Sequence, residues 1–275
     1  MIVAAALLLY GALYARRART LARRGRPQPA WRVACFGGGL LVLAFALVGP
    51  LERLADRRLA AHMAEHLLIG DVASVLVVLG LSGAVLAPLL RIRLLAPLRG
   101  LSHPVLALGL WAVDLWLWHA PALYEGALHH DAIHDLQHIC FFVFGAVLWV
   151  PLFGPFPRPD WFGAGAQLAY VLIVRVVAGV LANLFVWSGT IFYASYPSLG
   201  DQSAAGAIMM VEDSVVLVSL FGWLFLRWVR GAGERQELAE LSARLHAPVD
   251  TPRIARAVAA GRGGDLRRRL LDGAR

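Results

Sequence analysis

Long apolar stretches alternate with short polar segments along most of this chain. A helix that crosses a bilayer needs roughly 20 consecutive, mostly apolar residues, and helices satisfy the backbone hydrogen bonds that lipid cannot. Residues 2–15 suit only a thin or locally adapted bilayer, and the other stretches come closer to the usual length. The pattern predicts an all-α, polytopic transmembrane helix bundle of about seven spans, at residues 2–15, 31–48, 59–81, 104–119, 134–153, 163–187 and 203–226.

The distribution of arginine orients this predicted bundle. With seven spans, 22 of the 26 arginines fall on one side of the membrane, three fall on the other, and Arg175 lies within a span. Positively charged residues accumulate on the cytoplasmic side of membrane proteins. We therefore expect the N-terminus outside and the C-terminus in the cytoplasm. The inner segments include a loop with Arg91, Arg93 and Arg99 and a basic tail from Arg227 onward.

Composition supports a membrane protein and argues against nucleic acid as a partner. Hydrophobic residues make up 59% of the chain and charged residues 16%, whereas a soluble domain has roughly 25% charged residues. The net charge of +8 arises from arginines beside apolar spans, so the positive-inside rule explains it without a nucleic acid. Cys35 and Cys140 are too few to form a disulfide framework, and they are expected on opposite sides of the membrane.

Three segments follow from this reading. Residues 1–57 contain two N-terminal transmembrane helices and a basic inner loop, and residues 58–226 form the main bundle. Residues 227–275 form a basic cytoplasmic tail, in which residues 234–245 are expected to be a polar helix.

Histidines concentrate at the predicted outer face of the bundle. Five of the nine lie between Trp116 and Trp149, in and beside a predicted turn between two spans. Polar side chains are costly near lipid and often mark functional sites. The topology brings further side chains from separate spans to the same face. The candidates are His62, Met63, His66, His119, His134, His138, Met209 and Met210.

The spacing of these histidines favours a metal site. His62 and His66 are four residues apart, as are His134 and His138, so each pair projects from one helical face. A mixture of imidazole and thioether ligands favours copper, because the soft sulfur of methionine selects Cu(I). Glu65 and Asp135 are candidates for orienting an imidazole.

Each candidate also has a purely structural interpretation. An interfacial histidine often contacts only a loop or a headgroup, and this interpretation suits His103, His129 and His130. For Met209 and Met210 core packing is the favoured interpretation, and metal ligation is the alternative. We therefore expect the metal role to rest first on the two spaced histidine pairs.

Five charged residues lie deeper within the apolar runs, and they are Asp71, Asp114, Arg175, Glu212 and Asp213. Charges at such depth normally face the bundle interior and pair with one another. We predict structural ion pairs between Arg175 and the carboxylates, and a proton or ion path is the functional alternative.

Several sequence blocks resemble a known family. They are HMAEHLL at 62–68, LWLWHAPALYEGALHHDAIHDLQH at 115–138, Trp149-Val150-Pro151, Tyr193, Tyr196-Pro197, and DQSAAGAIMM at 201–210. Together they resemble the multi-pass CtaG-type cytochrome c oxidase assembly factors of bacteria, over most of residues 60–226. Met210 departs from the family pattern, which has tryptophan there.

The resemblance implies a multi-pass protein of the bacterial plasma membrane that matures a haem-copper oxidase at its copper-insertion step. It implies a copper-binding metallochaperone rather than an enzyme, with the oxidase subunits and an extracytoplasmic copper chaperone as partners. The implied copper ligands are His62, Met63, His66, His119, His134, His138 and Met209. Tyr124, Asp201 and Gln202 match motif positions whose role the sequence leaves open.

Two other classes of function fit the sequence. Histidines from two spans can act as axial ligands in a membrane b-type cytochrome, and one histidine-bearing side of the membrane allows at most one haem layer. A proton-coupled transporter would use Asp71, Asp114, Arg175 and Glu212. The chain shows no convincing pair of inverted repeats, and this argues against the transporter interpretation.

Overall fold

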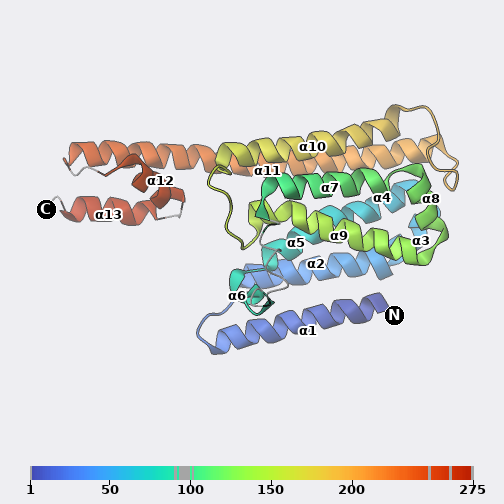
Figure 1. The fold of residues 1–275 in the computed structure, drawn as a ribbon, viewed down its shortest axis with the longest axis horizontal. Coiled ribbons are helices and arrows are strands. Elements are labelled where there is room, and N and C mark those ends of the chain that lie inside the picture. The colour runs from blue at the N-terminus through green and yellow to red at the C-terminus, as the bar shows by residue number, and fades with distance from the viewer. Residues whose placement is uncertain are drawn as a thin grey trace. The chain divides into compact units, whose positions relative to one another are not determined.

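The computed structural model of this chain describes residues 2–89, 92, 100, 102–246, 249–259 and 262–273. The secondary structure of these residues is helical, without a strand (Figure 1), which confirms the all-α class. Five described helices are long and apolar enough to cross a membrane, and a bent pair of helices adds a possible sixth. The count of seven spans and the orientation stay predictions, and the predicted inner-loop residues Arg91, Arg93 and Arg99 lie outside the described residues.

Two compact units make up the chain. The first contains residues 1–162 and 172–216, and the second contains residues 163–171 and 217–275. All the candidate metal ligands belong to the first unit. The predicted segment boundaries at 57/58 and 226/227 stay predictions.

The first unit begins with α1 (Ile2–Arg23), which continues past the predicted end at residue 15 through the arginine-rich segment. Its arginines keep α1 from counting among the candidate spans. The ring of Tyr14 stacks on Phe36 of α2 (Ala30–Val48) at 3.9 Å, and its hydroxyl donates a hydrogen bond to the Gly80 carbonyl at 3.0 Å. Contacts along the helix therefore anchor α1 to the bundle. The short α3 (Pro50–Ala55) follows α2.

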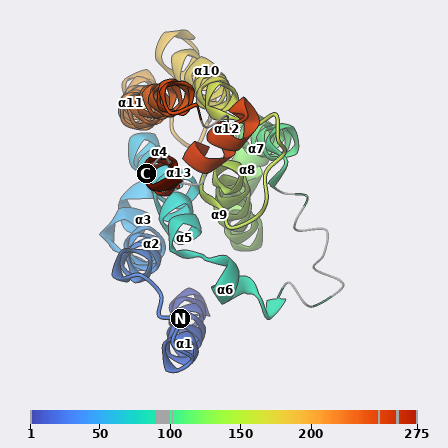
Figure 2. The same cartoon turned by 90° about the vertical axis from the view of Figure 1, so that its left-hand side faces the viewer.

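The third predicted span is one continuous helical path with a π-helical segment in its middle. It consists of α4 (Leu59–Leu67), η1 (Leu68–Ala73) and α5 (Ser74–Gly80). Helix α5 packs against α2 on one side and against α9 (Asp131–Phe153) on another (Figure 2). At Gly145 of α9 the backbones come so close that an added Cβ would lie 2.0 Å from the Gly70 carbonyl oxygen. Glycine at this position lets α9 and η1 approach.

The prediction of a turn after the fourth span is wrong, because most of the residues between the fourth and fifth predicted spans are helical. Helix α7 (Pro104–Trp118) is followed by α8 (Pro121–His129) after a bend of 70°. Ala120 is extended, with ψ of 129°, because a following proline disfavours the helical conformation. Pro121 then occupies the first turn of α8, where its missing N–H costs no hydrogen bond.

Helices α10 (Ala164–Trp187) and α11 (Leu199–Arg244) follow the short α6 (Gly83–Leu86), α7, α8 and α9 in chain order. The predicted seventh span and the predicted polar helix at 234–245 are a single helix of 46 residues. Within the first unit, Gly206 of α11 lies against α10, where an added Cβ would come within 2.7 Å of the Ala182 carbonyl oxygen.

The second unit contains the basic tail, which folds into helices. Helices α12 (Thr251–Ala259) and α13 (Gly263–Gly273) pack with the end of α11. Leu238, Ile254, Leu266 and Leu270 form a small buried core among them. The tail therefore has its own hydrophobic centre.

Candidate metal centre

Two histidine pairs from α4 and α9 meet inside the first unit. His62 and His66 lie one turn apart on α4, and His134 and His138 are spaced in the same way on α9. One ring nitrogen from each of the four lies within 4.8 Å of the others. His62, His66 and His138 are buried, and His134 is half-buried. The four imidazoles are therefore close enough for a single metal ion to bind all of them.

A buried tyrosine orients His62. The Tyr196 hydroxyl donates a hydrogen bond to the Ala55 carbonyl at 2.7 Å and lies 3.0 Å from Nδ1 of His62. Burial raises the pKa of Tyr196, so the hydroxyl keeps its single proton, which is used on Ala55. His62 Nδ1–H must then donate to Tyr196, which leaves a lone pair on Nε2. That nitrogen faces Nε2 of His66 at 2.9 Å, and it is the one available to a metal.

Of the two carboxylates predicted to orient imidazoles, the structure places one near the cluster. Glu65 is fully buried, and its Oε1 lies 4.0 Å from Nε2 of His138. Its two carboxylate oxygens have no hydrogen-bond partner among the described residues. Asp135 is exposed. Glu65 therefore adds a buried acidic group beside the four imidazoles, at a distance longer than a hydrogen bond.

His119 lies next to the cluster but outside the group of four. It follows the last residue of α7, and its ring centre is 6.3 Å from that of His66. Its Nδ1–H donates to the Leu115 carbonyl at 2.7 Å, while its Nε2 is buried without a hydrogen-bond partner among the described residues. This contact fixes the tautomer with the lone pair on Nε2. Tyr193 also fixes the end of α7, because its hydroxyl donates a hydrogen bond to the His119 carbonyl at 2.9 Å.

The histidines assigned to a loop role lie apart from the cluster. His129 and His130 are exposed at the end of α8, and His103 precedes α7. The Nδ1 of His129 lies 2.6 Å from the Glu125 carbonyl on its own helix. These three residues are absent from the four-histidine group.

Met63 and Met209 line a small cavity together with His66 and His119. Both methionines are also buried in a hydrophobic cluster that contains Tyr124. Met210 only packs against the edge of this cluster.

Tyr124 packs beside the histidines. Its ring stacks on Tyr193 at 3.8 Å and lies 5.3 Å from the ring centre of His62. Its hydroxyl is buried without a hydrogen-bond partner among the described residues. Tyr124 therefore forms part of the wall of the histidine cluster.

Asp201 and Gln202 have structural roles that the sequence left open. Asp201 accepts hydrogen bonds from the backbone N–H groups of Leu59 at 2.6 Å and Ala60 at 3.4 Å. It thereby caps the start of α4, the helix that carries His62 and His66. The buried Gln202 accepts from the Phe192 N–H at 2.9 Å and donates to the Thr190 carbonyl at 2.9 Å. It fixes the loop that carries Tyr193 and Tyr196.

One buried residue beside the cluster escaped the sequence analysis. Gln137, which precedes His138, is 1% exposed, and neither side-chain polar atom has a hydrogen-bond partner among the described residues. The only feature of the sequence that pointed to Gln137 was an amide side chain within an apolar span. An amide there indicates a functional residue only once the side chain is known to be buried.

Three of the other four deep charges gather around Arg175. Its guanidinium lies 3.6 Å from Asp71, 3.6 Å from Glu212 and 3.3 Å from Asp213. The structure therefore places the predicted ion pairs together. Asp114 lies outside this group and accepts a hydrogen bond from the side chain of Trp118.

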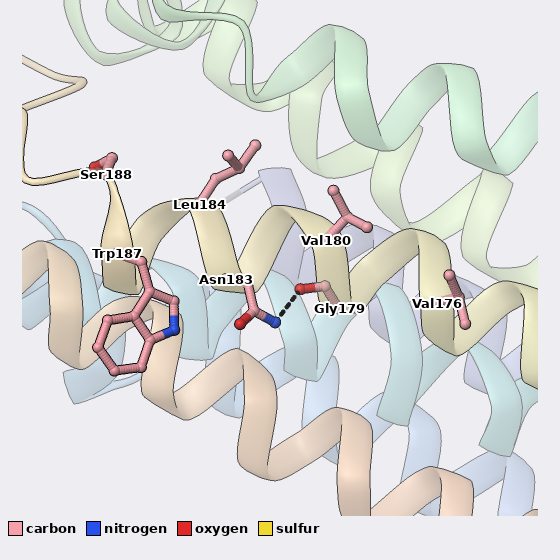
Figure 3. A pocket seen from close by; sticks show the side chains of 7 residues that line it. All are labelled: Val176, Gly179, Val180, Asn183, Leu184, Trp187 and Ser188. Atoms are coloured by element: carbon pink, nitrogen blue, oxygen red, sulfur yellow. Dashed lines mark hydrogen bonds between the residues drawn. The ribbon is translucent and has the colours of Figure 1, made fainter.

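A shallow hollow on α10 is unrelated to the histidines (Figure 3). It is lined largely by exposed apolar side chains, which include Val176, Val180, Leu184 and Trp187. Asn183 satisfies its amide by donating to the Gly179 carbonyl at 2.8 Å. The lining contains no histidine, methionine or carboxylate, so the hollow offers a metal no suitable donor set.

Comparison with known proteins gives one result that covers most of the chain. The family model described as cytochrome c oxidase caa3 assembly factor (Caa3_CtaG) matches residues 12–231. This range contains both histidine pairs, His119, the methionines and the Arg175 group. No curated protein matches the chain, and no solved structure matches it.

Proposed function

This chain belongs to the cytochrome c oxidase caa3 assembly factor family, and from that premise we propose that it binds copper and helps to insert it into the oxidase. The chain would act in the bacterial plasma membrane, at the outer face. Copper is its cargo, and we assign the chain no catalysed reaction. The oxidase subunit that takes up copper is the acceptor, and an extracytoplasmic copper chaperone is the proposed donor.

The observation that carries this proposal is the cluster of His62, His66, His134 and His138. Four neutral imidazoles with nitrogens within 4.8 Å of one another form a donor set for a transition-metal ion. Met63, His119 and Met209 line a cavity that also contains His66 of the cluster. The two methionines add the thioether sulfur that selects Cu(I), and His119 adds a further imidazole. Imidazole and thioether ligands can be exchanged one at a time, which suits a protein that releases its metal to a partner.

The same geometry favours copper over a b-type haem. Axial ligands bind a haem iron from opposite faces, with a metal–nitrogen distance of about 2 Å each, so their nitrogens lie about 4 Å apart. Here four imidazole nitrogens from two helices lie within 4.8 Å of one another, so four donors converge on one point instead of two facing each other across a macrocycle. An absorption spectrum of the purified protein without a Soret band would be the expected result.

The test is the copper content of the purified full-length protein. We expect His62→Ala/His134→Ala to lose copper that the wild type binds, because the variant removes one ligand from each pair. His129→Ala/His130→Ala is the matched control, because both side chains are exposed outside the cluster, and it should keep wild-type copper. Equal copper in the two double variants would overturn the proposal.

The link to the oxidase needs a second measurement. In cells that lack the endogenous assembly factor, the wild-type chain and the control variant should restore copper in the membrane-bound oxidase. The His62→Ala/His134→Ala variant should leave the oxidase deficient in copper despite normal amounts of both proteins. Full restoration by this variant would show that the cluster has no part in assembly.

A further inference from the structure

A small internal cavity adjoins the four-histidine cluster on the side of the π-helical segment. It has a volume of about 50 Å³, and its lining includes Met63, His66, His119, Met209, Asp71 and Glu212. Only His66 belongs both to this lining and to the four-histidine group. The cavity therefore has its own set of donors, which touches the cluster at one residue.

Two imidazole nitrogens at this cavity lack a partner among the described residues. His119 uses Nδ1–H on the Leu115 carbonyl, which leaves the lone pair of its buried Nε2 unused. Nδ1 of His66 is likewise buried and unpaired. A buried polar atom without a partner destabilises the folded protein. A ligand bound in the cavity would satisfy both nitrogens.

The charge around the cavity also favours a cation. Asp71 and Glu212 line it, and with Asp213 they surround Arg175. Three carboxyl groups share a single guanidinium there, and ionised carboxylates without a partner are expensive in an apolar bundle. A monovalent cation in the cavity would favour the ionised form of these groups, so the acidic lining is compatible with a bound cation. The donors themselves select which cation, because two thioethers and two imidazoles prefer Cu(I) to zinc or a hard ion.

We propose that this cavity is a second Cu(I) site, held by Met63, Met209, His119 and His66, which exchanges copper with the four-histidine cluster through His66. The proposal rests on the copper function proposed above. In the exchange, Cu(I) breaks its bonds to His62, His134 and His138 and forms bonds to His119 Nε2 and the two thioether sulfurs. His66 stays a ligand by changing from Nε2, which faces His62, to Nδ1, which is unpartnered among the described residues. The ring proton moves from Nδ1 to Nε2 in the same step, because a neutral imidazole has a single lone pair. Copper stays Cu(I) and no electron is transferred. When both sites are filled, His66 binds the ion in the cavity, and His62, His134 and His138 hold the other.

The competing interpretation is that both methionines only fill the core. Leucine separates the two roles, because it conserves the volume of methionine and removes the sulfur. The Met63→Leu/Met209→Leu variant therefore tests ligation with little change in packing. Met210→Leu is the matched control, because Met210 adjoins Met209 and packs on the same hydrophobic cluster without lining the cavity.

The experiment loads the full-length protein with Cu(I) under anaerobic, reducing conditions in detergent. Copper per chain is measured, and X-ray absorption reports copper–sulfur bonds. Cys35→Ala and Cys140→Ala are included in every variant, so that the free thiols contribute no signal. We expect two copper ions per chain with a copper–sulfur component in this background and in Met210→Leu. Met63→Leu/Met209→Leu should bind one ion without that component.

Two results would overturn the second site. One is retention of both copper ions by Met63→Leu/Met209→Leu, and the other is absence of copper–sulfur bonds in the parent protein. Failure of the four-histidine site has a different signature. The parent would then bind one sulfur-ligated ion, which His62→Ala/His134→Ala leaves in place and Met63→Leu/Met209→Leu removes.

Discussion

At the scale of single residues, the metal centre depends on side chains that fix the histidines. His62 presents the lone pair of Nε2 because its Nδ1–H donates a hydrogen bond to the Tyr196 hydroxyl, and Tyr196 is fixed by its own hydrogen bond to the Ala55 carbonyl. His119 is fixed in the same sense by the Leu115 carbonyl. Such contacts set the tautomer and the orientation of a ligand before the metal arrives.

The Tyr196→Phe substitution isolates this effect. It removes the hydroxyl that holds His62 while keeping the ring in the core. Loss of such a supporting contact typically weakens metal binding by about 10–100-fold, and we expect a decrease in Cu(I) affinity in this range. Competition with a Cu(I) chelator measures it.

Tyr14→Phe is the control for this prediction. Tyr14 is also buried, and its hydroxyl donates to the Gly80 carbonyl in a hydrophobic cluster that contains no proposed copper ligand. It should therefore bind Cu(I) more tightly than Tyr196→Phe. The same affinity in both variants would mean that the hydroxyl of Tyr196 does not orient a ligand.

The sequence predicted each histidine pair from local information, because a spacing of four residues places two side chains on one helical face. His62 with His66 and His134 with His138 follow from helix geometry, and the alternation of spans puts them at one face. The sequence did not predict that Asp201 caps α4. Its carboxylate caps α4 across 142 residues of sequence, and such a contact depends on packing that no local pattern encodes.

At the scale of elements, the site depends on how closely α9 approaches η1. Gly145 makes this approach possible, because any Cβ there would overlap the Gly70 carbonyl. The contact lies two turns beyond His138 on the same helix. Separation of these helices would therefore move the two histidine pairs apart.

Gly145→Ala should be destabilising, although alanine is the better helix former by about 1 kcal/mol. Overpacking of a close contact costs roughly 1–3 kcal/mol, so the steric cost is expected to exceed the gain in propensity. The melting temperature in detergent should fall, and copper binding should weaken. Gly109→Ala is the control, because a Cβ there meets no atom within 4 Å, and it should be neutral or stabilising. A stabilised Gly145→Ala protein would refute this account of the helix contact.

The elements that the sequence failed to predict share a physical reason. Apolar periodicity predicts that a stretch is helical, but it does not report the hydrogen-bond register within the helix. The π-helical η1 was therefore predicted as ordinary helix. The turn predicted after His119 is mostly α8, because polar residues and proline also suit a short helix that starts at Pro121.

At the scale of the whole molecule, one helix links the membrane bundle to the basic tail. Helix α11 has 46 residues, which corresponds to about 69 Å at 1.5 Å per residue. The hydrocarbon core of a bilayer is about 30 Å thick. Helix α11 must therefore extend well beyond the membrane if it spans it. Its apolar first half and its arginine-containing second half agree with the predicted direction, from outside to inside.

The predicted orientation places the four-histidine cluster and the tail on opposite sides of the membrane, and thiol labelling tests this directly. In a Cys35→Ala/Cys140→Ala background, His129→Cys introduces a thiol at an exposed position at the end of α8, and Glu237→Cys introduces one at an exposed position of α11 in the tail. We expect a membrane-impermeant thiol reagent to label position 129 in intact cells. Position 237 should react only after the cells are permeabilised, because 22 of the 26 arginines, including those of the tail, are predicted to face the cytoplasm. The reverse labelling pattern would place the histidine cluster at the inner face, and copper delivery from outside the cell membrane would then be impossible for this chain.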